Sequence, residues 1–106
     1  MNDDYDLVNR LKSLPNFLIY LDEIRIDENN DYRIIYRFNN HYGVSILREN
    51  YEDYLKLRIL KFFEEDEWWV DTNNSVSNEV IDHVKKDDLI RLLTNVKSLN
   101  EKGELP

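Results

Sequence analysis

The sequence predicts an α+β domain with an N-terminal helix, a four- or five-strand antiparallel sheet and two C-terminal helices. Two observations carry this prediction. Between residues 32 and 70 apolar and polar side chains alternate, which is typical of strands with one buried face. Beyond residue 77 the apolar side chains recur every three or four positions, which is typical of helices. A chain of 106 residues has the length of one domain, and we divide it into an N-terminal helix and extended segment (1–30), an antiparallel meander (31–71), a helical pair (75–98) and a tail (99–106).

The beginning of the chain predicts a helix over residues 4–14. Its apolar side chains follow helical spacing, and they are Leu7, Val8, Leu11 and Leu14. Pro15 disfavours helical backbone at the residue before it, so the helix is expected to stop there. Apolar residues then alternate over 17–27, which indicates an extended segment, with a continued helix as the alternative.

Four segments of the middle region predict strands. They are 32–38 ("YRIIYRF"), 44–48 ("VSILR"), 54–63 ("YLKLRILKFF") and 68–70 ("WWV"). The segment "NNHYG" between the first two is a turn, in which Asn39, Asn40 and Gly43 are able to adopt left-handed backbone. The segment "EEDE" before the last is a second turn, so we expect a meander of consecutive antiparallel strands.

The C-terminal region predicts two helices. Ser77 is a suitable N-cap for the segment "NEVIDHV". Asp87 and Asp88 fall in the first turn of a second helix, "DDLIRLLTNVKSL", whose apolar stripe comprises Leu89, Leu92, Leu93 and Val96. The tail 99–106 has no core signal and is expected to fray.

The composition excludes several kinds of chemistry. There is no cysteine, which excludes disulfides and thiol catalysis, and no apolar run approaches the ~20 residues of a membrane span. The acidic N-terminus is unlike a secretory signal, so we expect a cytoplasmic protein. The net charge of −8 is divided into an acidic first third, a basic middle (32–61) and an acidic last part, which favours basic protein partners.

The segment "KFFEEDEWWVDT", 61–72, is the leading candidate for a recognition surface, with a solvated turn as the alternative reading. Trp68 and Trp69 must point to opposite faces if they lie in a strand, so one is expected in the core and the other more exposed, either under a helix or in an interface. Glu79 and Asp82 lie three residues apart in the first of the two expected C-terminal helices, and they extend the acidic region. The predicted partner-binding residues are Glu64, Glu65, Asp66, Glu67, Trp68, Trp69, Asp71, Glu79, Asp82, Asp87 and Asp88.

Other functions find weaker support in the sequence. A single-stranded nucleic-acid binder would combine cations with stacking aromatic rings, and the candidates are Arg33, Arg37, Arg48 and Arg58 with the neighbouring tyrosines. His41 and His83 stand outside any metal-binding motif, Ser75 and Ser77 outside any nucleophile motif, and two glycines do not form a phosphate loop. We therefore predict no enzyme activity, no metal site, no cofactor, no membrane and no direct nucleic-acid contact.

From Arg33 onward the chain resembles a type of small uncharacterised protein of phages and mobile elements of Firmicutes. The resemblance covers about 60% of the chain. It lies in an aromatic strand, Tyr42-Gly43-Val44-Ser45-Ile46, an apolar strand at 55–60, a hairpin ending in Asp71-Thr72, and "SNEVIDHVKKDDLIRLL". This chain departs from that type at Lys85, where a Thr cap is usual, and at the acidic turn 64–67, which replaces a shorter Gly turn.

The resemblance implies a phage origin and a host cell cytoplasm, but the type has no assigned activity. Together with the charge, it predicts a stoichiometric inhibitor of a host nucleic-acid defence enzyme, most concretely an anti-CRISPR protein that occupies the DNA-binding groove of a Cas nuclease. The alternative is a phage structural or regulatory interaction module that acts as a homodimer.

Overall fold

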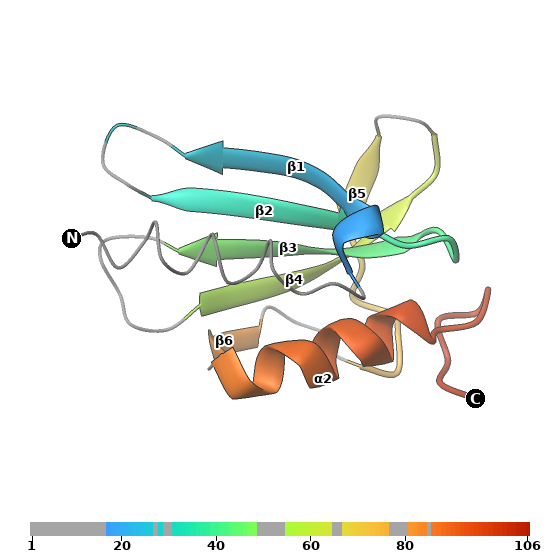
Figure 1. The fold of residues 1–106 in the computed structure, drawn as a ribbon. Helices are drawn as coiled ribbons and strands as arrows, with labels where there is room; N and C mark the ends of the chain where they lie inside the picture. The colour runs from blue at the N-terminus through green and yellow to red at the C-terminus, as the bar shows by residue number, and fades with distance from the viewer. Residues whose placement is uncertain are drawn as a thin grey trace.

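A computed structural model describes residues 17–26, 28, 31–48, 55–64, 67–76, 81–84 and 86–106, without the side chains of 83, 86 and 87. Its central feature is one antiparallel sheet with a helix packed against it (Figure 1). The elements are the 3-10 turn η1 (Leu18–Tyr20), the strands β1 (Leu21–Ile26), β2 (Tyr32–Arg37), β3 (Tyr42–Arg48), β4 (Leu55–Phe62), β5 (Trp68–Val70) and β6 (Ile81–Val84), and the helix α2 (Lys86–Lys97).

The sheet follows the order β1-β2-β3-β4-β5, so the first five strands form a meander. The strand β6 leaves this order and pairs with β4. Both β5 and β6 lie on the same edge of β4: Leu60 to Phe62 pair with β5, whereas Leu55 and Leu57 pair with β6. The two ends of β4 therefore meet different parts of the chain.

The face of the sheet that packs against α2, here called the helix face, carries the main core. Alternate residues of β2, β3 and β4 contribute Tyr36, Val44 and Ile59, all essentially inaccessible to solvent. The helix adds Leu93 and Val96, which are equally buried. The opposite face has a smaller apolar cluster, formed by Ile35, Leu60 and Phe62 with Trp68 and Val70 beside them.

The prediction of a helix in the segment 87–99 is confirmed by α2. Its predicted apolar stripe, Leu89, Leu92, Leu93 and Val96, is buried on the helix face. The C-terminus of α2 is fixed by Asn40 of the β2–β3 turn, whose amide Nδ2 donates to the carbonyl oxygens of Val96 and Leu99, both at 2.9 Å. These bonds satisfy carbonyls that have no partner within the helix.

The predicted architecture is wrong in its helices. The segment "NEVIDHV" was expected to be the first of two C-terminal helices, but Ile81–Val84 is the strand β6. In the described part of the chain, six strands accompany one α-helix and the 3-10 turn, so the expected pair of C-terminal helices is not formed. The expected helix over 4–14 falls outside the described residues.

The physical reason for β6 lies in β4. The strand β5 pairs with only the last three residues of β4, and backbone groups on the first part of the same edge still need hydrogen-bond partners. The β-branched Ile81 and Val84 suit a strand as well as a helix, and pairing with Leu57 and Leu55 decides between them.

Two further local expectations are corrected. The extended reading of 17–27 holds from Leu21 onward, whereas Leu18–Tyr20 form η1 and leave Ile19 82% exposed. In the turn "NNHYG" the left-handed residue is His41, with φ of 70°, and Gly43 lies in β3. Gly43 is required there by close packing, because a Cβ atom would overlap the carbonyl oxygen of Tyr36.

The tail was expected to fray, but it is packed. Leu99 is 3% exposed and belongs to the main core. The amide of Ser75 donates to the carbonyl oxygen of Gly103 at 2.7 Å, and the amide of Asn100 donates to that of Glu104 at 2.9 Å. Among the residues that the structure describes, no helix is long and apolar enough to cross a membrane.

Candidate interaction surface

The β4–β5 hairpin presents two aromatic rings to solvent. Phe63 is 47% exposed and Trp69 is 50% exposed, and their rings stack with centroids 4.4 Å apart and planes 27° apart. Side chains alternate along a strand, so the pair lies on one side of the hairpin and Phe62 and Trp68 on the other. We call Phe63, Trp69 and the exposed carboxylates Glu64 and Glu67 the hairpin surface.

The prediction that the two tryptophans point to opposite faces is confirmed. Trp68 packs against the cluster of Ile35, Leu60 and Phe62, where it is partly buried. Trp69 pairs across the strands with Lys61 and remains half exposed. The exposed ring of Trp69 is therefore anchored by its partly buried neighbour in the chain, Trp68.

The base of the hairpin is held in place by an arginine on the face opposite α2 and by backbone hydrogen bonds. The Arg37 guanidinium lies 4.6 Å from the centroid of the Phe62 ring, and its Nη2 donates to the carbonyl oxygen of Glu64 at 3.5 Å. The amide of Phe63 donates to the carbonyl oxygen of Glu67 at 3.3 Å. Below the hairpin, the amide of Asp71 donates to the carbonyl oxygen of Ile59 at 2.7 Å. These contacts fix the direction in which the aromatic pair points.

The remaining predicted acids do not gather around this surface. Asp71 has a structural role, because its Oδ2 accepts a hydrogen bond of 2.9 Å from Asn74 Nδ2. Asp82 lies on β6, beside the start of β4, and Asp88 lies in the first turn of α2, where its carboxylate is 3.4 Å from Arg91. Glu64 lies seven positions after Leu57, which pairs with β6, and seven positions of extended chain span about 23 Å. The acids thus lie at two ends of the molecule.

Four predicted partner-binding residues are outside what the structure describes. Glu65, Asp66 and Glu79 lie in undescribed segments, and the side chain of Asp87 is likewise not described. Of the predicted residues, Glu64, Glu67 and Trp69 are described and exposed at the hairpin surface, and their role in binding stays a prediction. The structure adds Phe63, which the sequence prediction did not include. Phe63 could have been found from strand parity, since it alternates with Phe62 and faces the same side as Trp69.

The arrangement of cations and tyrosines disfavours base stacking on the sheet. Arg33 and Arg58 point to the face opposite α2, whereas Tyr32 and Tyr36 are buried on the helix face. Arg48 is only 7% exposed and also lies on the helix face, opposite Tyr32. Bases would need exposed rings beside the cations, and these tyrosines lie on the other side of the sheet.

The structure also describes several residues that the sequence analysis considered for metal binding or nucleophilic chemistry. No group of three or more histidine, aspartate or glutamate side chains there could hold a metal ion. His41 is an exposed turn residue, and the side chain of His83 is not described. Ser75 is exposed beside the tail, and Ser77 falls outside the described residues.

The chain was compared with protein-family models, curated proteins and solved structures, and none of the three comparisons finds a match.

Proposed function

We propose that this protein is a stoichiometric inhibitor that binds a basic surface of a host nucleic-acid defence enzyme, most concretely an anti-CRISPR protein in the DNA-binding groove of a Cas nuclease. The observation that carries the proposal is the hairpin surface: a stacked aromatic pair, half exposed, with two exposed glutamates in the turn that joins the two strands. The resemblance to phage proteins and the net charge of −8 supply the class of partner.

The hairpin surface has the composition of an interface centre. Tryptophan is enriched among the residues that dominate binding energy, and an already stacked pair loses little conformational freedom on binding. A nucleic-acid enzyme holds its substrate in a groove lined by arginine and lysine. Arginine stacks on aromatic rings and forms ion pairs with carboxylates. Trp69 would supply the aromatic ring, and Glu64 and Glu67 would supply the carboxylates.

The proposal does not need a continuous acidic array. The hairpin surface is separated from Asp82 and Asp88 by the length of β4. The remote acids would contribute to the rate of association through the long-range field and little to the contact itself. The proposal can therefore be tested by placing the same change in net charge at the hairpin surface or at a remote position.

The test compares two variants with the same change in net charge. Glu64→Lys/Glu67→Lys alters the hairpin surface, and Asp22→Lys/Asp82→Lys alters two exposed acids elsewhere. Both raise the net charge from −8 to about −4 at neutral pH. Tagged proteins are used to capture partners from lysate of the host, and captured nucleases are then assayed for DNA cleavage with increasing inhibitor.

We expect the wild type and the Asp22/Asp82 variant to capture a nucleic-acid enzyme and to inhibit it at a ratio near one to one. The hairpin variant is expected to lose both properties, and Trp69→Ala is expected to lose them without any change in charge. If the two charge variants weaken capture equally, the contact is a diffuse field effect and the hairpin proposal is wrong. If no nucleic-acid enzyme is captured, the inhibitor proposal is wrong.

The alternative of a homodimeric module is favoured by the same exposed aromatic pair, because two apolar rings are also suited to bury each other across a two-fold axis. Sedimentation equilibrium separates the two functions. A dimer that dissociates on dilution, and that becomes a monomer in Trp69→Ala, would favour the homodimeric module over the inhibitor.

A further inference from the structure

A second charged surface lies on the face of the sheet opposite α2. The register places Arg25 beside Arg33, Arg33 beside Leu47, and Leu47 beside Lys56, which makes one row across four strands. The next row along the strands runs through Glu23, Ile35, Ser45 and Arg58. We call Arg25, Arg33, Lys56 and Arg58 with Glu23 the cationic patch. Neighbouring strands lie ~4.8 Å apart, so the patch is about 14 Å wide.

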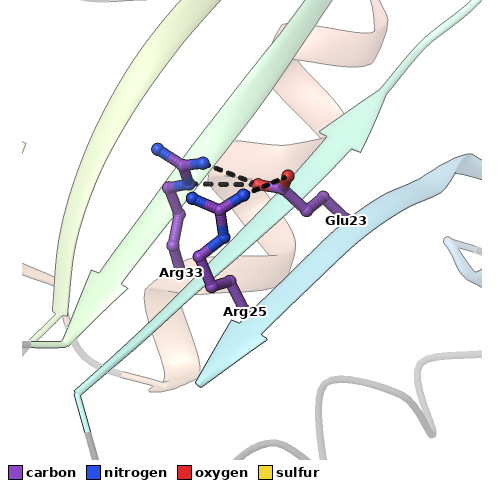
Figure 2. Close-up of polar contacts among 3 residues, drawn as sticks. All are labelled: Glu23, Arg25 and Arg33. Carbon is purple, nitrogen blue, oxygen red and sulfur yellow. Dashed lines mark hydrogen bonds and ion pairs between the residues drawn. The ribbon is translucent and has the colours of Figure 1, made fainter. Parts of the chain in front are cut away.

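The contacts of Glu23 show how this patch holds a carboxylate (Figure 2). Its Oε2 accepts hydrogen bonds from Arg33 Nη2 at 2.8 Å and from Arg33 Nε at 3.2 Å, and its Oε1 lies 3.6 Å from Arg25 Nη2. Two arginines directly opposite each other would repel, and the carboxylate between them offsets that repulsion. Arg33 thus binds one carboxylate oxygen through two N–H groups and Arg25 approaches the other oxygen, so one carboxylate is shared by two guanidinium groups.

One carboxylate does not neutralise the patch. Four cations and Glu23 leave a local charge of +3 in a chain whose net charge is −8. Among the residues that the structure describes, no ion pair involves Lys56 or Arg58. Arg58 is exposed, and the side chain of Arg25 is 70% exposed. The patch therefore retains capacity for further anionic groups on the side of β4.

We propose that the cationic patch binds a short acidic segment of another polypeptide, with carboxylates of that segment paired to Lys56 and Arg58 beside the site that Glu23 already occupies. The hairpin surface is on a different part of the sheet, so this inference does not depend on the proposed inhibitor function. A few carboxylates match a surplus of three positive charges.

A nucleic acid fits the patch less well for two reasons. The tyrosines are on the helix face, and the described part of the patch has no exposed aromatic ring on which a base could stack. A nucleic-acid strand also extends past the patch into the field of a protein of net charge −8. A short peptide stays within one Debye length of the cations, about 8 Å at physiological salt.

The test uses three fluorescein-labelled probes: a peptide with six consecutive glutamates, the same peptide with six glutamines, and a thymidine oligonucleotide with a similar number of charges. Fluorescence anisotropy is measured at salt concentrations of about 50 mM and about 300 mM, since surface ion pairs weaken as screening increases. The protein variants are Lys56→Gln/Arg58→Gln and a matched control, Arg91→Gln/Lys102→Gln, which removes two exposed cations elsewhere.

The wild type and the matched control are expected to bind the glutamate peptide, with affinity that falls as salt rises. The Lys56/Arg58 variant is expected to bind it about tenfold more weakly, because two charge-assisted contacts are removed. Glu23→Gln removes the internal carboxylate and raises the patch to +4, so it is expected to bind the peptide more tightly. Circular dichroism establishes that each variant is folded.

Three results would overturn the proposal. Tighter binding of the oligonucleotide than of the glutamate peptide would make the patch a nucleic-acid surface. Equal affinity for the glutamate and glutamine peptides would show that binding does not depend on the peptide's negative charge. Equal loss of affinity in the Lys56/Arg58 variant and the matched control, or no saturable binding at low salt, would make the patch a solvated face of the sheet.

Discussion

Removing the hydroxyl group of Tyr32 from the core is expected to stabilise the protein, whereas most core substitutions are destabilising. Tyr32 is 3% exposed, and its hydroxyl has no hydrogen-bond partner in the described structure. Burying a polar group without a partner costs about 1–3 kcal/mol of folding free energy. Tyr32→Phe removes that group and keeps the ring, so we expect the free energy of unfolding to rise by about 1 kcal/mol, toward the low end because the phenyl ring leaves a small void.

Tyr42→Phe is the matched control, because the chemical change is the same and the surroundings differ. Tyr42 is 2% exposed, but its hydroxyl accepts a hydrogen bond of 3.1 Å from Lys61 Nζ. Removing the hydroxyl leaves the lysine without this acceptor, so Tyr42→Phe is expected to lower the free energy of unfolding by about 1 kcal/mol.

Urea unfolding followed by tryptophan fluorescence measures both variants, and Trp68 in the apolar cluster supplies the signal. For a domain of this size, about 1 kcal/mol corresponds to a shift of roughly 4–8 °C in Tm, which calorimetry resolves. The decisive result is the difference in sign. If Tyr32→Phe is destabilising by as much as Tyr42→Phe, the Tyr32 hydroxyl is satisfied in solution and the reasoning is refuted.

Three further predictions concern the fold. Burial raises the pKa of Tyr36 to about 12, so the folded state keeps a proton that the unfolded state loses near pH 10. Stability should therefore fall between about pH 10 and 12, by up to ~1.4 kcal/mol per pH unit. Urea midpoints that decline equally in Tyr36→Phe would contradict this. Gly43→Ala should lower the free energy of unfolding by at least ~2 kcal/mol, because the new methyl group would overlap the Tyr36 carbonyl oxygen and lie 2.7 Å from the Phe62 ring. A Tm close to that of the wild type would show that β2 and β3 can separate to make room. Asn40→Ala should cost about 1–2 kcal/mol, because the carbonyl oxygens of Val96, Lys97 and Leu99 lose the hydrogen bonds from Asn40 Nδ2. Faster amide exchange at the end of α2 than at its start is the expected signature.

Local patterns were sufficient for the strands β2 to β5, whereas the segment of β1 left a helix open as the alternative. In β2 the period of two separates Tyr32, Ile34 and Tyr36 from Arg33 and Arg37, and no other element is needed to read it. The same holds for α2, whose buried residues repeat every three or four positions. The parity argument also predicted which way Trp68 and Trp69 face relative to each other, because adjacent residues of a strand cannot share a face.

Long-range contacts explain what the sequence could not predict. The segment around Ile81 becomes a strand because β4 offers an unpaired edge more than twenty residues away in sequence. The tail is held by a hydrogen bond from Ser75 to Gly103, and Leu99 is buried in the main core, although 99–106 itself carries no strong periodic signal. Such segments depend on tertiary contacts that override weak local propensity.

The distribution of charge follows from the same topology. One edge of β4 is shared between β5 and β6, so acids that are close in sequence to β6 are directed to the opposite end of the sheet from Glu64 and Glu67. Alternation along β2 and β4 then collects Arg33, Lys56 and Arg58 on a single face, which net charge alone would never suggest. A uniform acidic surface would make every charge reversal equivalent at equal net charge. This fold instead predicts that position decides the effect: lysines at the hairpin surface should abolish binding to a basic enzyme, whereas the same lysines elsewhere should mainly slow association, and neither change should affect an acidic peptide held at the cationic patch.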